Sequence, residues 1–410
     1  MSQMVIDSCL RAGGSDPIFR MAAMANEKKA EIGKDKVIDS TLGALFDDAG
    51  RLVCFDAVYD TMKSLDNCDI ASYAGIGGIP SYLKSAIGDC FGDDLPDAYI
   101  EAVATPGGTG AIRHAFCNYT ELGDAILVSD WHWQPYETIA AENRRQVAFF
   151  PLFNDKNAFH LSAFKEKFNE LAEKQKRVLT VLNTPAHNPT GYSISTEEWQ
   201  AILSFLKEKA ESGIPIIVLC DIAYIDYASK EERAFTQLLS DLPENVLFLF
   251  AFSASKSYTM YGLRNGALIC LSSSEETVKE FVNTCSFSNR GTWSNGTRCA
   301  MEIVAKIKEN PELQARFSAE RNKHKAVLQK RAEAFLKAAE KAQLPTLPYK
   351  SGFFITIPCE QSQKVAERLM EDNLFMVAIN GGLRFAVCAV PEFQCAQAPK
   401  MIANAIQVVS

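Results

Sequence analysis

One lysine near the middle of the sequence has the setting of a covalent catalyst. Lys256 stands shortly after the apolar run 246–252, which predicts a buried strand. A lysine at the end of a buried strand loses hydration, which lowers its pKa and leaves a neutral amine that can attack a carbonyl group. Arg264, eight positions later, offers a planar fork of donors that suits a phosphate. The pair indicates a Schiff base between Lys256 and pyridoxal 5′-phosphate (PLP), although a solvated lysine at a strand end would give the same local pattern.

Polar residues follow two other apolar runs in the same way. Asn188 comes after the run 177–182, and Asp221 and Tyr224 come after the run 214–219. Open α/β sheets bind their ligands just past the carboxyl ends of their strands. We therefore expect these residues and the lysine to border one site.

A glycine-rich turn supplies a candidate phosphate-binding segment. Gly107, Gly108 and Thr109 follow the expected strand 99–104 and open a helix. Glycines let the backbone approach a ligand closely, and a helix start directs free N–H groups and the positive end of the helix dipole toward an anion. The turn therefore predicts a phosphate site shared with Arg264.

The elements that must position these residues alternate along the chain. Strand and helix patterns alternate from about residue 95 to 270, which predicts a mostly parallel sheet, and Thr196 is the expected cap of one of these helices. The charged, helix-rich stretch 296–343 predicts a long helix leading to a smaller domain. Apolar runs at 351–357 and 383–387 predict strands of that domain.

Taken in order, these motifs resemble those of the class I PLP-dependent aminotransferases, most closely the aspartate/aromatic aminotransferase subgroup. The resemblance runs from residues 16–18 to Arg384, nearly the whole chain. It implies the aspartate aminotransferase-like PLP-dependent transferase fold, an α/β fold whose large domain has a mostly parallel seven-stranded sheet beside a smaller α+β domain. The expected boundaries are an N-terminal arm and part of the small domain at 1–46, the large PLP-binding domain at 47–310 and the small C-terminal domain at 311–410.

The resemblance also implies a reaction. An aminotransferase moves an amino group between an L-amino acid (aspartate, glutamate or an aromatic one) and a 2-oxo acid such as 2-oxoglutarate, by ping-pong Schiff-base chemistry on Lys256. A C–S lyase, a decarboxylase or a cyclase on the same fold is the alternative, because the cofactor performs most of the chemistry in all of them. A PLP-binding gene regulator is disfavoured, since it needs an added DNA-binding module and this chain is acidic.

Roles around the cofactor ring follow from the same resemblance. Asp221 would pair with the pyridine nitrogen and keep it protonated. Tyr224 and Asn188 would donate hydrogen bonds to the phenolate oxygen. Trp133 would stack on the ring, and its spacing to the residues that follow favours it over Trp131.

The phosphate contacts are expected to come from two subunits. Ser253, Arg264 and the turn at Gly107 to Thr109 would hold the phosphate together with Tyr73 from the other subunit of a homodimer. The family often has serine where this chain has Gly107, so one hydroxyl contact is absent.

Substrate contacts are expected from five residues. Arg384 would clamp the α-carboxylate, with Trp133 and Asn188 beside it. Gly43 would let the chain pass close to the substrate, although a simple turn glycine would look the same. In the aspartate subgroup an arginine shortly before a Ser-Asn pair crosses from the partner subunit to bind a distal carboxylate. Arg290 stands at that spacing, but the chain is shorter nearby, and a plain surface arginine is the alternative.

Composition excludes several other classes. A chain of 410 residues with 47% hydrophobic residues is long enough for two domains with proper cores. We expect no membrane partner because no long uncharged apolar run occurs, and no nucleic-acid partner because the net charge is -8. The 12 cysteines are scattered without a Cys-x-x-Cys pair, so we expect reduced thiols, no metal ion and a cytoplasmic location.

Overall fold

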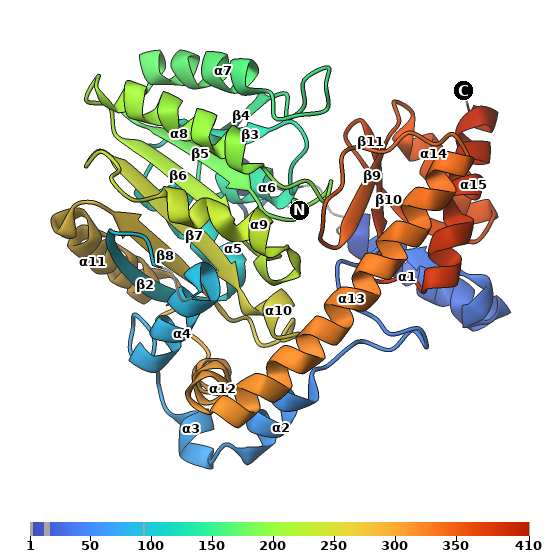
Figure 1. Ribbon diagram of the computed structural model, residues 1–410, viewed down its shortest axis with the longest axis horizontal. Helices are drawn as coiled ribbons and strands as arrows, with labels where there is room; N and C mark the ends of the chain where they lie inside the picture. Colours follow the sequence, from blue (N-terminus) through green and yellow to red (C-terminus); the bar gives the residue numbers. More distant parts are fainter. Residues whose placement is uncertain (1–2, 12–16, 93–94, 410) are drawn as a thin grey trace.

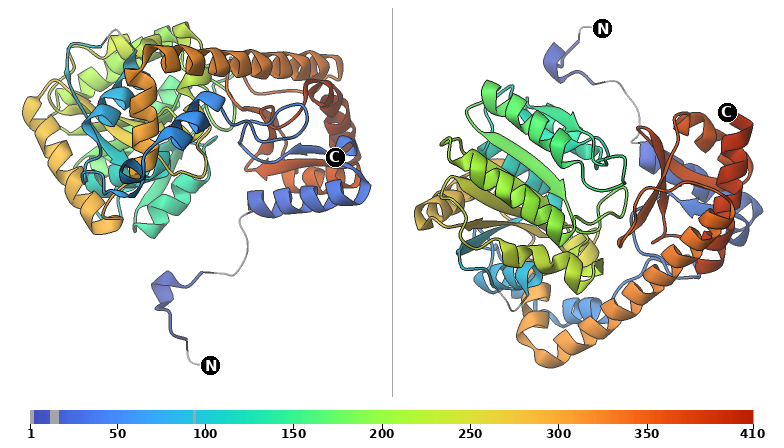
Figure 2. Two further views of the ribbon diagram at one scale, coloured as in Figure 1. Left: turned by 90° about the horizontal axis from the view of Figure 1, so that it is seen from below. Right: turned by 45° about the horizontal axis from the view of Figure 1, so that its top comes forward.

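A computed structural model describes residues 3–11, 17–92 and 95–409, and it divides them into two lobes that are joined by one long helix (Figure 1). Of the expected N-terminal arm, the structure describes residues 3–11. That segment contains a single turn of 3-10 helix, η1 (Asp7–Cys9), and extends away from the body of the molecule (Figure 2).

The larger lobe is built on a seven-stranded sheet. Its strands, in spatial order, are β2 (Tyr99–Thr105), β8 (Gly266–Ser272), β7 (Val246–Ser253), β6 (Ile216–Asp221), β5 (Val178–Asn183), β3 (Ala125–Ser129) and β4 (Gln146–Phe150). Strand β8 runs antiparallel to β2 and β7, and the other pairings in this sheet are parallel, so the prediction of a mostly parallel seven-stranded sheet is confirmed. Every residue of β6, β7 and β8 is buried, as expected for strands that are covered on both faces.

Helices cover both faces of this sheet (Figure 1). One face packs against α5 (Gly107–Asn118), α6 (Pro135–Glu142) and α11 (Glu275–Thr292), and the other against α7 (Leu161–Lys174) and α8 (Thr196–Ala210). The prediction that Thr196 caps α8 was wrong by one residue. Ser195 is the cap, because its hydroxyl accepts from the Glu198 N–H while the Glu198 carboxylate accepts from the Ser195 N–H.

Shorter helices fill the rest of the large lobe. They are α2 (Asp56–Ser64), α3 (Asn67–Ala71), α4 (Pro80–Phe91), α9 (Lys230–Arg233), α10 (Ala254–Ser257) and α12 (Arg298–Glu309), with 3-10 turns η3 (Ile225–Tyr227) and η4 (Ala234–Leu238). The four residues of α10 include Lys256, and they directly follow strand β7.

The smaller lobe has a four-stranded sheet in the order β1 (Ile38–Ser40), β10 (Leu374–Ile379), β11 (Gly382–Ala386) and β9 (Phe354–Pro358). Helices α1 (Pro17–Ile32), α14 (Ser362–Glu371) and α15 (Glu392–Val409) pack beside it. A turn of 3-10 helix, η2 (Lys34–Lys36), lies between α1 and β1. Because β1 pairs with β10, residues near both ends of the chain share one sheet. Because the first and last parts of the chain build this lobe together, we propose domain boundaries after residues 46 and 310.

The stretch 296–343 forms two helices, not one long helix. Helix α13 (Pro311–Lys341) has 31 residues and follows α12 after a break at Asn310. The Asn310 side chain accepts from the N–H groups of Glu312 and Leu313, while Pro311 has no N–H to continue the earlier helix. Despite the length of α13, no helix of the described chain is both long and apolar enough to cross a membrane.

Candidate active site

The predicted chemical groups meet where three parallel strands end. Strands β5, β6 and β7 are neighbours, so their carboxyl ends lie side by side above a cavity of about 150 Å³. The cavity is lined by Gly108, Thr109, Ile112, Trp133, Asn183, Asn188, Asp221, Ala223, Tyr224, Ser253, Ser255, Lys256 and Arg264. The structure therefore brings together most of the predicted cofactor-binding residues.

Lys256 presents its amine to this cavity from α10. Its side chain is largely enclosed, and this burial lowers the pKa of Lys256 to about 8. The cations Arg264 and Arg384 act in the same direction, because a nearby positive charge disfavours the protonated amine. Near neutral pH the cavity thus holds a much larger fraction of neutral amine than a solvated lysine would supply.

Asp221 at the end of β6 is held by three donors. Its Oδ2 accepts from the Tyr136 hydroxyl at 2.5 Å and from Asn183 Nδ2 at 3.3 Å, and its Oδ1 accepts from the Ala223 N–H at 3.2 Å. Burial raises the pKa of Asp221, and the hydrogen bonds from Tyr136 and Ala223 oppose this rise. A cation placed in the cavity would favour the ionised form of the carboxylate further.

Tyr136 and Asn183 are functional candidates that sequence reasoning missed. Tyr136 lies in the first turn of α6, three residues after Trp133, and its hydroxyl also accepts from Asn183 Nδ2 at 2.8 Å. Its position close behind an expected ring-stacking tryptophan was the available signal. Asn183 was visible as the last residue of a strand that ends at the predicted site.

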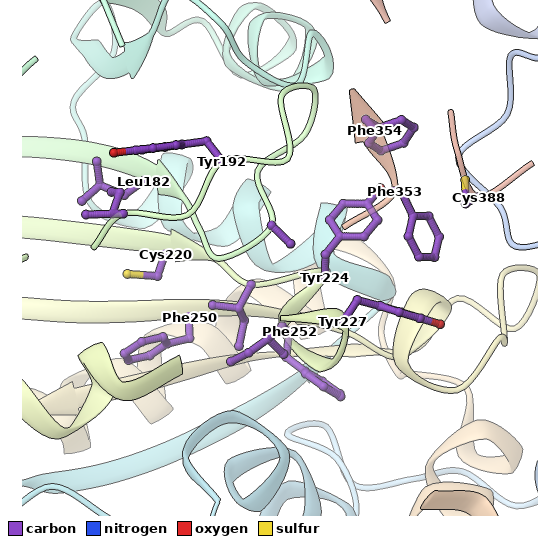
Figure 3. Close-up of a cluster of buried hydrophobic side chains, with 14 of the residues drawn as sticks. Leu182, Tyr192, Cys220, Tyr224, Tyr227, Phe250, Phe252, Phe353, Phe354 and Cys388 are labelled. Atoms are coloured by element: carbon purple, nitrogen blue, oxygen red, sulfur yellow. The ribbon is translucent and has the colours of Figure 1, made fainter. Parts of the chain in front are cut away.

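Tyr224 lies between the cavity and the smaller lobe. Its ring centroid is 5.0 Å from that of Phe353 and 5.8 Å from that of Phe354, so strand β9 and the segment before it pack directly on it (Figure 3). Burial raises the pKa of the Tyr224 hydroxyl, and Arg384 and a hydrogen bond with Asn188 oppose this rise. The hydroxyl is therefore a proton donor over the physiological pH range.

The start of α5 forms a cradle for an anion. No side chain caps its first N–H groups, and Ser253, Ser255 and Arg264 border the same part of the cavity. Gly107 has a φ of +72°, and a Cβ there would lie 2.8 Å from Arg264 Nη2. A side chain at Gly107 would strain the backbone at this positive φ, and it would lie close to the end of the Arg264 side chain. Hydroxyl, amide and guanidinium donors together suit a phosphate.

The two candidate tryptophans occupy different places. Trp133 lines the cavity and contacts the Tyr136 ring edge-to-face, with centroids 5.4 Å apart. Trp131 packs against the turn between β10 and β11, where a Cβ on Gly382 would lie 3.1 Å from its indole ring. Of the two, Trp133 is the one that borders both cavities and can lie against a ring bound in the first.

A second cavity of about 350 Å³ adjoins the first, since Trp133 and Asn188 line both. Arg384 on β11 lines it and is buried, with its guanidinium 4.3 Å from the Phe354 ring centroid and Nη2 donating to Thr41 O at 2.9 Å. Gly43 lies against the tip of the same ring, because a Cβ there would be 2.7 Å from Phe354 Cζ. Packing against Phe354 leaves little room for a side chain at Gly43.

Tyr73 and Arg290 do not line either cavity within their own chain. Tyr73 is 87% exposed, and Arg290 donates from Nη1 to Ser294 Oγ at 2.6 Å on the surface. Both were expected to act on a partner subunit, and those roles stay predictions.

A partly buried lysine, a supported carboxylate and an anion cradle at the strand ends of an α/β fold are the groups expected of an enzyme that binds a phosphorylated carbonyl compound. The chain belongs to the family described as aminotransferase class I and II, whose sequence model matches residues 36–402. The predictions of the family, of an aminotransferase and of the fold are confirmed.

Curated relatives agree with this assignment. The chain is 28% identical over 308 residues to the aromatic-amino-acid aminotransferase of Paracoccus denitrificans, covering 73% of this chain and 75% of that protein. It is 26% identical over 341 residues to the aspartate aminotransferase of Escherichia coli, covering 80% and 81%.

Solved structures extend the match to the whole chain. An aminotransferase from Anaerococcus prevotii shares 37% identity with a TM-score of 0.96, covering 99% of this chain and 100% of that one. An aromatic-amino-acid aminotransferase from Burkholderia pseudomallei, covalently bound to pyridoxal phosphate, has a TM-score of 0.81 at 20% identity, covering 98% and 100%.

Proposed function

We propose that this protein is a PLP-dependent aminotransferase that moves an amino group from an L-amino acid to a 2-oxo acid such as 2-oxoglutarate. The observation that carries the proposal is the shared cavity at the strand ends. There a partly buried amine, a supported carboxylate and an anion cradle face one another, and a buried arginine lines the adjoining cavity.

The residues present fit PLP. The start of α5, Ser253 and Arg264 would hold its phosphate, and Asp221 would hold the proton on its ring nitrogen. Tyr224 and Asn188 would donate to its phenolic oxygen. Bound PLP supplies an electron sink for the electron pair that remains when a bond to the substrate α-carbon breaks.

The chain's own residues then orient the substrate and move protons. Arg384 would bind the α-carboxylate and so fix which bond at the α-carbon is exposed to the ring. Lys256 Nζ, with its pKa lowered to about 8, would form the covalent attachment and later take up and return the α-proton. Trp133 would exclude water from the face of the ring that it covers.

A single-turnover assay tests the proposal. The holoenzyme mixed with an amino acid alone should release one equivalent of 2-oxo acid per subunit and then stop, and 2-oxoglutarate should restart it. A lyase or a decarboxylase would instead continue to turn over the amino acid without an oxo acid. Continued release under those conditions would refute the aminotransferase assignment.

A homodimer with shared sites is supported by the exposed surface. Tyr73 is 87% and Phe287 82% exposed, and in the N-terminal segment Met4 is 89% exposed. An interface with another chain would cover apolar side chains of this kind where they gather into one patch. We propose that Tyr73 serves the phosphate site of the partner subunit.

Mixing two inactive variants tests this sharing. A Lys256→Ala subunit paired with a Tyr73→Ala subunit should contain one intact site, because the functional lysine and the functional tyrosine then face the same cavity. Activity should rise well above that of either parent, toward roughly a quarter of wild type for random exchange of two subunits. If exchange is demonstrated and activity does not rise, each site belongs to one chain.

Arg290 is proposed to bind the distal carboxylate of an acidic donor from the partner subunit. A charge-assisted pair of this kind is worth about 3 kcal/mol, so Arg290→Ala should lower kcat/KM for aspartate and glutamate roughly 100-fold. Aromatic donors should be much less affected and act as the internal control. An equal loss for both donor classes would remove Arg290 from substrate selection.

A cytoplasmic location is also proposed. All 12 cysteines are free thiols, and several of them, such as Cys54 and Cys68, are exposed. Exposed thiols persist in a reducing compartment. Fractionation of the native host's cells, with the protein followed by antibody, would test this location.

A further inference from the structure

Helix α13 carries two arginines that lie ten residues apart outside the active site, Arg331 buried and Arg321 mostly buried. Arg321 pairs through Nη1 with Asp226 Oδ1 at 2.8 Å, and the side chains are 15% and 2% exposed. Arg331 is 1% exposed, pairs through Nη2 with Asp48 Oδ1 at 2.7 Å and donates from Nη1 to Cys388 O at 3.1 Å. Buried guanidinium groups are costly to desolvate, so their placement calls for a reason.

The Arg321 end of the helix holds the turn that carries Lys256. Asp226 also accepts a hydrogen bond from the Ser257 hydroxyl, directly after the lysine. Phe317, one helical turn before Arg321, stacks on the Tyr258 ring with centroids 4.5 Å apart. Two consecutive residues after the lysine are therefore fixed from α13, one by an ionic link and one by packing.

The Arg331 end holds the segment that carries Arg384. Its contact with Cys388 O lies just past β11, the strand that contains Arg384. Phe335, one helical turn after Arg331, packs on Phe385 with centroids 4.5 Å apart, and Phe385 directly follows Arg384. The two ends of the same helix thus touch the neighbours of the two central charged groups of the site.

Helix α13 is built to keep these two ends at a fixed distance. It contains no glycine or proline after Pro311, so it has no sequence site for a kink. Arg321 and Arg331 are separated by roughly 15 Å of continuous helix. Within the described residues, no strand pairing joins the two sheets, whereas α13 runs along both lobes (Figures 1 and 2).

We propose that Arg321 and Arg331 are positioning residues, through which α13 sets the separation between the Lys256 amine and the Arg384 guanidinium. Arg321 acts on the lysine turn through Asp226 and Ser257, and Arg331 acts on the strand end beyond Arg384. The inference rests on the proposed function for the roles of the lysine and the arginine. The test measures the Lys256 end and the Arg384 end separately, and neither measurement depends on which reaction follows.

Three variants of the full-length chain are compared: Arg321→Gln, Arg331→Gln and the control Arg316→Gln. Arg316 lies on the same helix but pairs with Asp60 and Glu320 at the surface. The lysine end is read as the rate at which added PLP becomes fixed to the protein by borohydride. The arginine end is read as the dissociation constant of a carboxylate without an amino group, maleate or 3-phenylpropionate, measured by calorimetry on the holoenzyme.

We expect opposite patterns from the two buried sites. Arg321→Gln should slow PLP fixation about 10-fold or more and change carboxylate affinity about 2-fold or less. Arg331→Gln should weaken carboxylate binding about 10-fold or more and change the rate of PLP fixation about 2-fold or less. In turnover, the first should lower kcat and the second should raise KM. Arg316→Gln should change neither. Equal changes in both readouts for both variants, or changes no larger than the control's, would overturn the proposal.

A second pair of variants separates positioning from folding. Arg321→Gln leaves the buried Asp226 carboxylate with Arg233, at 3.5 Å, as its one remaining ion-pair partner among the described residues, so this variant can lose stability for that reason alone. The double variant Asp226→Asn/Arg321→Gln removes both charges, and it should still slow PLP fixation while thermal unfolding stays close to wild type. Arg321→Lys should recover part of the rate. A double variant with normal PLP fixation would refute the proposal. A wild-type protein that fixes PLP and binds carboxylates but fails the single-turnover assay would refute only the proposed reaction.

Discussion

Replacing Lys256 with alanine should abolish borohydride-fixed PLP on the protein and lower turnover at least 1,000-fold, which corresponds to about 4 kcal/mol of transition-state stabilisation. Lys256 is the only lysine among the described residues that line the two cavities. No other amine there can form the attachment or take its place in moving the α-proton. Steady-state kinetics and mass spectrometry after borohydride treatment would measure both effects.

Another lysine, Lys350, provides a matched control for the loss of an amine. Lys350 donates from Nζ to Ser193 O at 2.8 Å and lines neither cavity, so Lys350→Ala should retain PLP fixation. Normal turnover in the Lys256 variant would end the assignment of the lysine.

The pH dependence of attachment should reflect the same environment. Because the pKa of Lys256 is lowered to about 8, the neutral amine becomes the major form as pH rises through that value. The rate of PLP fixation to the cofactor-free chain should therefore increase with pH up to about 8 and level off above it. A rate that keeps rising toward pH 10 would show that the amine is solvated in the protein.

The second large effect is expected at Asp221. Asp221→Asn keeps the size of the side chain but removes the negative charge that would hold a proton on the ring nitrogen of the cofactor. We expect kcat to fall about 1,000-fold, because the electron sink depends on that proton. PLP fixation by Lys256 should persist, which separates this loss from loss of the cofactor.

Tyr136→Phe gives a graded comparison at the same carboxylate. It removes the hydrogen bond of 2.5 Å to Asp221 and keeps the charge and the aromatic ring. A hydrogen bond to a charged group is worth about 1.5–3 kcal/mol, so kcat should fall roughly 10- to 100-fold, less than in Asp221→Asn. If the asparagine variant keeps its rate within about tenfold of wild type, the carboxylate has no electrostatic role.

The sequence by itself determined the large sheet and the groups at its edge. Short continuous apolar runs such as 246–252, alternating with helical patterns, indicate strands that are buried on both faces, and polar residues that follow such runs emerge at one edge because the strands are parallel. Register then leaves little freedom. Asp221 pairs with Ala251 in the sheet, so the aspartate and the segment leading to Lys256 are fixed by backbone hydrogen bonds.

The sequence did not decide between two nearby residues that suit the same role. Ser195 and Thr196 both suit a helix cap, and Trp131 and Trp133 both suit a stacking role. The first pair is decided by which hydroxyl reaches the Glu198 N–H. The second pair is decided by the turn between β10 and β11, because Trp131 packs against Gly381 and Gly382 in that turn.

Only the tertiary structure decided which residues support the site from a distance. Tyr136 reaches Asp221 across 85 positions of sequence, and Arg331 reaches Cys388 across 57. Periodicity and turn chemistry act over a few residues, whereas such contacts depend on how separate elements pack. Arg321 and Arg331 look like ordinary surface residues of a charged helix in the sequence. Their burial appears only when α13 is packed against neighbouring elements such as α2, α12 and α15, because side-chain environment is a property of the packed molecule.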